Sequence, residues 1–217
     1  MANFFRDRRD AGRQLAAHLK AYAGRSDVTV LALPRGGVPV GYEVAKALGA
    51  PLDVLVVRKL GVPQQPELAM GAIASGGARY LVDDAFWDAR VDPSALREVE
   101  ERERAELARR EKLYRGTRAP LQVDGRIVIL VDDGIATGAS IRVAAMALRS
   151  LHPRHIVVAV PVAPVYTAQR LGDAVDEFVC VHESRSFYAV GQFYDDFGQT
   201  TDEEVRELIE HPREAHA

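Results

Sequence analysis

Cysteine is nearly absent from the chain, since Cys180 is the only one among 217 residues. A single thiol forms no internal disulfide and no CxxC motif, so a disulfide framework and paired-thiol redox chemistry are excluded. Cys180 lies in the apolar run EFVCV, where nothing nearby would lower the pKa of a thiol. We therefore predict that Cys180 is a small core residue rather than a reactive thiol. Since the chain has no disulfide framework, we also expect a cytoplasmic protein.

The chain also lacks an excess of positive charge and any long apolar run. Its formal net charge is −3 and its sequence pI is about 6.1, which gives no electrostatic basis for general binding to nucleic acid or to an anionic membrane. The first residues, MANFFRDRRDAGRQLA, contain no apolar core of a signal peptide, and no later stretch approaches a membrane span. We expect no membrane partner and no nucleic-acid partner.

What the chain does contain is a regular alternation of strand-like and helix-like segments. This alternation predicts the α/β class, with an open parallel central sheet flanked by helices, in one domain over residues 1–217. The predicted strands are residues 28–33, 52–57, 126–131, 155–162 and 176–181. The predicted helices are residues 7–23, 38–48, 140–151, 163–171 and 201–211.

Two further segments interrupt this alternation. Residues 61–77 are rich in Pro, Gln and Gly, with a short strand-like piece at 71–75, which is typical of a functional lid or a disordered excursion. Residues 93–114 form a long charged helix with acid-before-base pairs four residues apart and a thin apolar stripe. We expect this inserted helix to be solvated and packed by one narrow face. Its arginines do not indicate a nucleic-acid surface, because interleaved glutamates cancel their charge.

The most informative stretch is VILVDDGIATGAS, residues 128–140. An apolar strand ends at Asp132 and Asp133, and in open parallel sheets ligands bind beyond the carboxyl ends of the strands. The small residues that follow let backbone N–H groups converge on one point, while Thr137 and Ser140 add hydroxyl donors at the start of a helix. This arrangement suits a phosphate monoester, and the missing GK[ST] argues against a Walker-type triphosphate loop.

Two carboxylates beside an anion site make sense if they bind hydroxyl groups or a divalent cation a few ångströms from the phosphate. A ribose 5-phosphate unit, with a phosphate at one end and vicinal hydroxyls in its middle, fits both halves of the stretch. The spacing alone leaves a structural alternative open, in which the aspartates cap a strand–turn junction and TGAS is an ordinary helix N-terminus.

The same thirteen residues resemble the signature of the type I phosphoribosyltransferases, in which four apolar residues precede two acids and a small-residue loop. The resemblance runs from PRGGVPVGYEVA through VRKLGVPQQPELAMGAI to the signature, and it is greatest to a bacterial group of phosphoribosyltransferases with unassigned substrates. It implies a site for 5-phosphoribosyl 1-pyrophosphate (PRPP), with Asp132 and Asp133 binding the ribose 2′- and 3′-hydroxyls. The loop implied to bind the 5′-phosphate consists of Gly134, Ile135, Ala136, Thr137, Gly138, Ala139 and Ser140.

The turn LPRGG after the first predicted strand is similar to the pyrophosphate loop of this family. Arg35 supplies positive charge, and Gly36 and Gly37 permit backbone conformations closed to other residues. Because strand–turn–helix junctions often carry glycines, a purely structural role for the turn is the alternative.

Arg58 and Lys59 fall where these enzymes carry a mobile loop that closes over the substrate. A cation brought in by a lid would stabilise the negative charge on the departing pyrophosphate, so either residue is a candidate for this catalytic role. The alternative is that both are solvent-exposed charges at a strand end.

In this family a variable hood recognises the acceptor, and residues 183–199 are the best candidate for it, together with the N-terminal segment. Their aromatic side chains either stack on a planar base or pack the small core of the hood itself. These residues are Phe187, Tyr188, Phe193 and Tyr194.

Ala136 narrows the choice of acceptor. The residue matching it is an aspartate in the hypoxanthine–guanine branch, where it is placed to interact with the purine N7, so alanine argues against that branch. Adenine and orotate enzymes resemble the chain at this position, but neither of their base-binding patterns is recognisable elsewhere.

The resemblance implies a Mg²⁺-dependent phosphoribosyltransferase of nucleotide metabolism. We expect it to transfer the ribose 5-phosphate unit of PRPP to an unidentified nitrogenous-base acceptor, as a cytoplasmic enzyme and a candidate homodimer. The metal would be held chiefly by oxygens of PRPP, with water-mediated help from Asp132 and Asp133. Two alternatives stay open, a non-catalytic regulator that binds a phosphoribosyl ligand and a hydrolase of a ribosyl phosphate.

Overall fold

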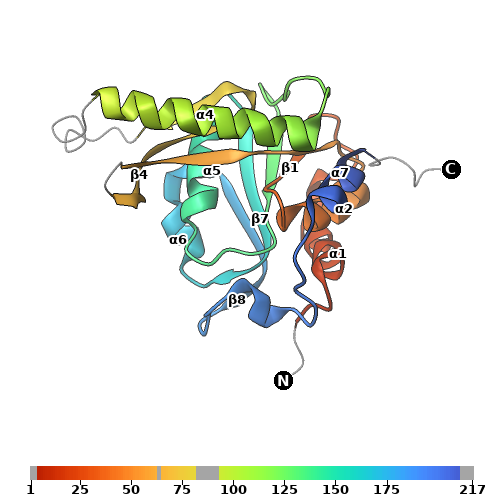
Figure 1. Cartoon of the computed structure of the whole chain (residues 1–217). Helices are drawn as coiled ribbons and strands as arrows, with labels where there is room; N and C mark the ends of the chain where they lie inside the picture. The colour runs from red at the N-terminus through yellow and green to blue at the C-terminus, as the bar shows by residue number, and fades with distance from the viewer. Residues whose placement is uncertain (1–3, 63–64, 82–92, 211–217) are drawn as a thin grey trace.

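The computed structural model describes residues 4–62, 65–81 and 93–210, leaving aside the side chains of residues 65–69 and of residue 93. A parallel sheet with the strand order β2-β1-β6-β7-β8 forms its centre (Figure 1). Its strands are β1 (Val28–Ala32), β2 (Leu52–Val54), β6 (Ile127–Val131), β7 (His155–Pro164) and β8 (Glu177–Ser184). The predicted α/β fold with an open parallel sheet is thereby confirmed.

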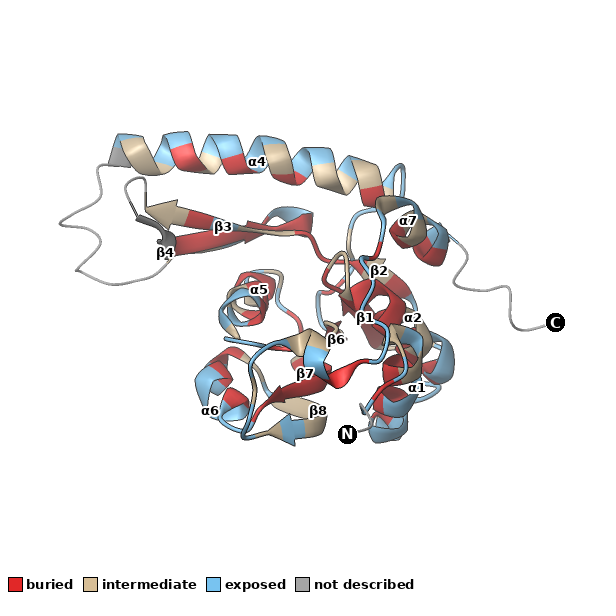
Figure 2. Ribbon diagram, turned by 60° about the horizontal axis from the view of Figure 1, so that its bottom comes forward, coloured by how far each residue is buried: buried red, intermediate tan, exposed pale blue. Residues whose placement is uncertain are grey.

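Helices cover both faces of this sheet (Figure 2). The helices α1 (Arg8–His18), α2 (Gly37–Leu48) and α7 (Asp202–Glu210) pack into one apolar cluster, and α5 (Ala139–Arg149) and α6 (Thr167–Leu171) pack into the other. Strands β1 and β6 are buried along their whole length as a result. This two-sided burial explains why both strands are continuous apolar runs in the sequence.

A second, antiparallel sheet has the strand order β3-β4-β5. Its strands are β3 (Val57–Val62), β4 (Gln65–Ala74) and β5 (Ala78–Leu81), and they lie between α5 and the long helix α4 (Pro93–Arg115) in Figure 2. Ile73 joins the apolar cluster of α4, whereas Ala74 joins that of α5. This small sheet is therefore packed on both faces.

The second sheet corrects the expectation of a weakly structured segment at residues 61–77. Most of that segment is regular strand, and only residues 63 and 64 lie outside the described part of the chain. Ala72, Ile73 and Ala74 are fully or almost fully buried. The small side chains that weaken the strand signal in the sequence are the ones that fit between two helices.

The inserted helix agrees with its prediction. Its buried residues Val99, Glu103, Leu107 and Tyr114 form one narrow face, as the thin apolar stripe indicates. The helix is also tied to the central sheet, because Arg115 donates from Nε and Nη2 to both carboxylate oxygens of Asp53, each at 3.0 Å.

The remaining differences from the prediction concern element boundaries. The predicted strand 52–57 is divided between β2 and β3, and β7 continues through Pro164, so that α6 begins at Thr167. Thr201 caps the N-terminus of α7, because its hydroxyl accepts from the backbone N–H of Glu204 at 3.1 Å. Among the described helices, none has the length and apolar composition needed to cross a membrane.

Candidate functional site

The signature stretch lies at the middle of the parallel sheet. Strand β6 pairs with β1 on one side and with β7 on the other. Asp132 and Asp133 follow its last residue, Val131, which is in register with Ala32 at the end of β1. The turn after β1, residues 34–36, and the acidic pair therefore share one edge of the sheet, as expected for ligand sites in open parallel sheets.

The loop between β6 and α5 is anchored on one side and exposed on the other. Ile135 is buried, and its backbone N–H donates to the Val162 carbonyl at 2.9 Å. Ala136, Thr137, Ala139 and Ser140 are exposed, so an anion can approach this loop at the N-terminus of α5.

Two positions of this loop need glycine, each for a different structural reason. Gly138 adopts a left-handed conformation, with φ of 80°, just before α5 begins. A Cβ on Gly134 would lie 2.6 Å from a methyl group of Val190 and 2.9 Å from one of Val162. The loop can therefore follow its path only with glycine at both positions.

The two acids have different partners. Asp132 Oδ1 accepts from the backbone N–H of Asp133 at 2.9 Å, whereas Asp133 Oδ2 accepts from Nε of Arg8 at 2.8 Å. Burial and the neighbouring charge of Asp133 raise the pKa of Asp132 well above its usual range. Burial also raises the pKa of Asp133, but the Arg8 guanidinium opposes this shift. Asp133 is thus the acid that carries a dedicated counter-ion.

The turn Arg35-Gly36-Gly37 lies directly against the acidic pair. A Cβ on Gly36 would lie 2.0 Å from Asp133 Oδ2, and a Cβ on Gly37 would lie 2.9 Å from the Cα of Asp132. The peptide bond between Pro34 and Arg35 is cis. The two loops at this edge of the sheet are therefore in van der Waals contact.

This contact replaces the reason expected for Gly36 and Gly37, which was an unusual backbone conformation. Gly36 has φ of −58° and ψ of −32°, an ordinary right-handed conformation, and Gly37 is not among the glycines with positive φ. The turn needs glycine for the close approach of the aspartates rather than for an unusual backbone conformation.

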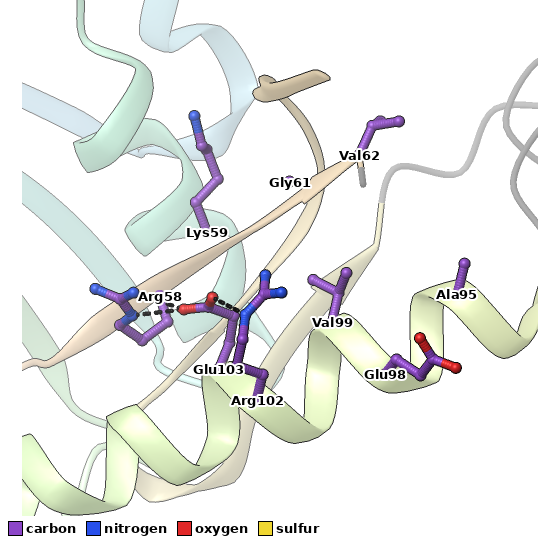
Figure 3. A pocket seen from close by; sticks show the side chains of 9 residues that line it. All are labelled: Arg58, Lys59, Gly61, Val62, Ala95, Glu98, Val99, Arg102 and Glu103. Atoms are coloured by element: carbon purple, nitrogen blue, oxygen red, sulfur yellow. Dashed lines mark hydrogen bonds and ion pairs between the residues drawn. The ribbon is translucent and has the colours of Figure 1, made fainter. Parts of the chain in front are cut away.

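Arg58 and Lys59 are neighbours on β3, so their side chains leave opposite faces of the strand. Figure 3 shows Arg58 directed toward α4, where its Nη2 and Nε donate to Glu103 Oε2 at 2.6 and 2.8 Å. Lys59 points away from α4 in the same view, on the side where β3 packs against α5. The two sequence candidates thus leave opposite faces of the strand, and both are among the residues that line a cavity of about 410 Å³ beside α4.

The hood residues form a small apolar cluster of their own. Phe193 and Tyr194 are buried with Phe5, and Phe187 packs against them. Tyr188 is 90% exposed. Two of the four predicted acceptor aromatics therefore have their rings in the core of the hood.

The hood is joined both to the N-terminal segment and to the acidic pair. The backbone of Phe5 donates to the Phe193 carbonyl at 3.0 Å and accepts from the N–H of Asp195 at 2.9 Å. The hydroxyl of Tyr194 donates to the backbone carbonyl of Asp133 at 2.5 Å. The structure thus places the hood beside the signature aspartates.

A sequence profile described as the phosphoribosyl transferase domain matches residues 6–197, which is most of the chain. The chain belongs to this family. Two proteins of Mycobacterium tuberculosis, from strains CDC 1551 and H37Rv and provisionally named phosphoribosyl transferases, are each 50% identical to it over 201 residues. The match covers 93% of this chain but 45% of theirs, so the chain spans less than half the length of these curated relatives.

Two solved structures are similar to the chain in fold. TT1426 from Thermus thermophilus shares 44% identity and a TM-score of 0.84, over 94% of this chain and 97% of that one. A hypothetical protein from Neisseria gonorrhoeae, solved with bound ppGpp, shares 11% identity and a TM-score of 0.51, over 98% and 99% of the two chains. The latter similarity shows the fold alone.

One residue at the candidate site was missed by sequence reasoning. Arg8, in the first turn of α1, reaches Asp133 although 125 residues separate them in the chain. In the sequence it stands in RDRRD among other arginines and acids, and no local pattern distinguishes it from Arg6 or Arg9. Only the fold brings it to the acidic pair.

The only cysteine of this phosphoribosyltransferase chain is expected to be unreactive in the folded state. Cys180 lies on β8, and burial raises the pKa of its thiol to about 12. Because thiolate forms only as the pH approaches that value, iodoacetamide at pH 8 should modify the native protein far more slowly than the unfolded protein. Mass spectrometry during alkylation, with and without guanidinium, measures both rates. Rapid modification of the native protein would contradict this expectation.

Proposed function

We propose that the chain transfers the ribose 5-phosphate unit of PRPP to a nitrogenous-base acceptor and releases pyrophosphate. The observation that carries this proposal is the meeting of three elements at one edge of the sheet. These are the exposed loop at the start of α5, the pair Asp132 and Asp133, and the turn Arg35-Gly36-Gly37 packed against that pair. We further propose that residues 1–217 act as one domain, in the cytoplasm.

Each element suits one part of PRPP. The exposed amides and hydroxyls of residues 136–140 can hold the dianionic 5′-phosphate at the N-terminus of α5. The carboxylates of Asp132 and Asp133 can accept hydrogen bonds from the vicinal ribose hydroxyls. The turn at Arg35 then lies on the pyrophosphate side, where backbone amides and a guanidinium favour the departing anion. Catalysis in this arrangement rests on positioning and on stabilisation of the leaving group.

The acidic pair also fits Mg²⁺, which prefers oxygen ligands and usually retains several waters. Among the described residues, hydrogen bonds engage Oδ1 of Asp132 and Oδ2 of Asp133. The second oxygen of each carboxylate can therefore bind hydroxyls or metal-bound water. No group of three or more His, Cys, Asp or Glu side chains among the described residues is placed to hold a metal alone. Most ligands of the ion would therefore come from PRPP and water, and the ion would neutralise phosphate charge.

Lys59 is our candidate for the cation that faces the leaving group. Arg58 points to α4 and is held by Glu103, whereas Lys59 emerges on the opposite face of β3 (Figure 3). Because β3 is part of a sheet packed between two helices, the position of Lys59 is set by the fold. That a mobile loop carries this cation over the substrate stays a prediction.

Substitutions at these neighbouring positions should have different effects. Lys59→Met should weaken binding of pyrophosphate with Mg²⁺ by about tenfold or more, because a charge-assisted hydrogen bond contributes about 1.5–3 kcal/mol. Arg58→Met should leave this affinity nearly unchanged, but lower the free energy of unfolding by about 1–2 kcal/mol through loss of the partly buried pair with Glu103. Calorimetric titration and thermal unfolding of both variants measure these effects. A larger loss of affinity in Arg58→Met than in Lys59→Met would reverse the assignment.

The hood, residues 183–199 with the N-terminal segment, is the proposed acceptor side of the site. Its position beside Asp133 supports this proposal, because an acceptor must approach the ribose from a surface other than the two phosphate loops. With Phe193 and Tyr194 buried, the backbone and polar groups of the hood are better placed than these two rings to select the acceptor. A homodimer remains part of the proposal.

The decisive experiment incubates the protein with PRPP, Mg²⁺ and a panel of nitrogenous bases, and measures the release of pyrophosphate. Release that depends on one base supports the transferase. Release without any base would identify a hydrolase, and tight PRPP binding without any release would identify a regulator. An absence of PRPP binding would overturn the proposal altogether.

A further inference from the structure

Arg8 is held at three points around its guanidinium. Its Nε donates to Asp133 Oδ2 at 2.8 Å, and its Nη1 donates to the Gly198 carbonyl at 2.5 Å. The guanidinium carbon lies 3.9 Å from the centre of the Phe197 ring. The side chains of Arg8 and Asp133 are only 12% and 15% exposed. Arg8 is therefore fixed in place before any ligand binds.

Anchoring of the N-terminal helix does not explain this ion pair. Helix α1 is already secured by Leu15, which is fully buried and packs in the main apolar cluster. The backbone of Phe5 is also paired with the hood in both directions. An ion pair largely removed from water gives little net stability, since the cost of desolvation offsets much of the attraction between the charges.

The geometry of Asp133 gives the pair a clearer role. Arg8 engages Oδ2, the oxygen that also faces Gly36 of the pyrophosphate turn. Fixing one carboxylate oxygen fixes the plane of the group, and thus the direction in which Oδ1 is presented. Arg8 also offsets one of two adjacent negative charges at a site proposed to receive a polyanion, where unshielded carboxylates would repel the phosphates.

We propose that Arg8 is a positioning residue for PRPP, which acts through Asp133 by orienting its other oxygen toward the ribose and by offsetting its charge. This inference rests on the proposed function, because it assumes that Asp133 binds the ribose of PRPP. It extends the site from the signature to the N-terminal helix.

A double-mutant cycle on PRPP affinity tests the proposal. In the otherwise wild-type protein, Arg8→Met should weaken PRPP binding with Mg²⁺ by about tenfold, the usual scale for one charge-assisted hydrogen bond. In an Asp133→Asn background, the same substitution should change the affinity for PRPP by less than about threefold, because Arg8 then has no carboxylate through which to act. Arg8→Lys, which keeps a cation beside Asp133, should restore most of the affinity.

Arg9→Met is the matched control, because Arg9 is the next residue of α1 and pairs with Glu43 at 3.8 Å. It should bind PRPP like the wild type, and thermal unfolding should show that every variant compared is folded. Equal affinity of Arg8→Met and the wild type would overturn the inference and leave the proposed function standing. An equal loss from Arg8→Met in both backgrounds would also overturn it, since Arg8 would then act on PRPP directly. Failure of the wild type to bind PRPP would overturn the proposed function, and the inference with it.

Discussion

Replacement of Asp133 by asparagine is expected to weaken PRPP binding by about 10- to 100-fold, because hydrogen bonds to a charged group contribute about 1.5–3 kcal/mol. Asparagine keeps the size of the side chain, so the contact with Gly36 is preserved. The substitution also leaves Arg8 without its carboxylate. Because Arg8 is largely buried, we expect the free energy of unfolding to fall by about 3–5 kcal/mol. Calorimetric titration with PRPP and Mg²⁺ measures the affinity, and thermal unfolding measures the stability.

A matched control separates these two effects. Asp53→Asn removes the carboxylate of another largely buried ion pair, in which the side chains of Arg115 and Asp53 are 9% and 14% exposed. Asp53 lies on β2 and ties that strand to the end of α4. We expect a similar loss of stability in this variant, with unchanged affinity for PRPP. Unchanged PRPP affinity in Asp133→Asn, or an equal loss in Asp53→Asn, would contradict the role assigned to Asp133.

Gly36→Ala is expected to impair both the fold and the site. The new Cβ would lie 2.0 Å from Asp133 Oδ2 and 2.7 Å from its Cγ, which is closer than atoms approach in proteins. Either the pyrophosphate turn or the aspartate must move, and overpacking of this kind costs about 1–3 kcal/mol. We expect the unfolding temperature to fall and PRPP affinity to drop by at least about tenfold, because either the turn proposed to face the pyrophosphate or the aspartate proposed to bind the ribose is displaced.

The double variant Gly36→Ala with Asp133→Ala tests the cause of that loss. Truncation of Asp133 removes the two atoms that would lie within 3.0 Å of the new Cβ and leaves Nε of Arg8, at 3.3 Å, as its remaining close neighbour. If steric conflict is the cause, Gly36→Ala should cost less stability in the Asp133→Ala background than in the wild type, while PRPP affinity stays low in the double variant. An equal loss of stability in both backgrounds would show that Gly36 has a conformational role instead.

The parts of the fold that could be predicted are the elements whose burial is apparent from the amino acids of the segment itself. Strand β6 is buried on both faces and reads as a continuous apolar run, which few other structures produce. The small antiparallel sheet could not be recognised in this way. Its strand β4 includes Gly71, Ala72 and Ala74, and it is stabilised by packing between α4 and α5 rather than by strand propensity.

The candidate site likewise has residues that could be predicted from the sequence and residues that could not. The acids and the loop after β6 are contiguous in the chain, so their pattern suggests a sugar-phosphate site, with a strand–turn cap and an ordinary helix N-terminus as the structural alternative. Arg8 reaches them from 125 residues away, and such a contact leaves no trace in a single sequence. The separation of Arg58 from Lys59 follows directly from strand alternation, but it could be inferred only with β3 recognised as a strand. The reason for Gly36 likewise depends on a contact that only the fold creates.

A crystal structure of the protein with PRPP and Mg²⁺ tests the central claim most directly. The account predicts the 5′-phosphate against the amides of residues 136–140, the ribose hydroxyls on Asp132 and Asp133, and the pyrophosphate beside the Arg35 turn. It also predicts that Arg8 still holds Asp133 Oδ2 in the complex. A PRPP molecule bound elsewhere, or bound with its 5′-phosphate at the Arg35 turn, would contradict the account.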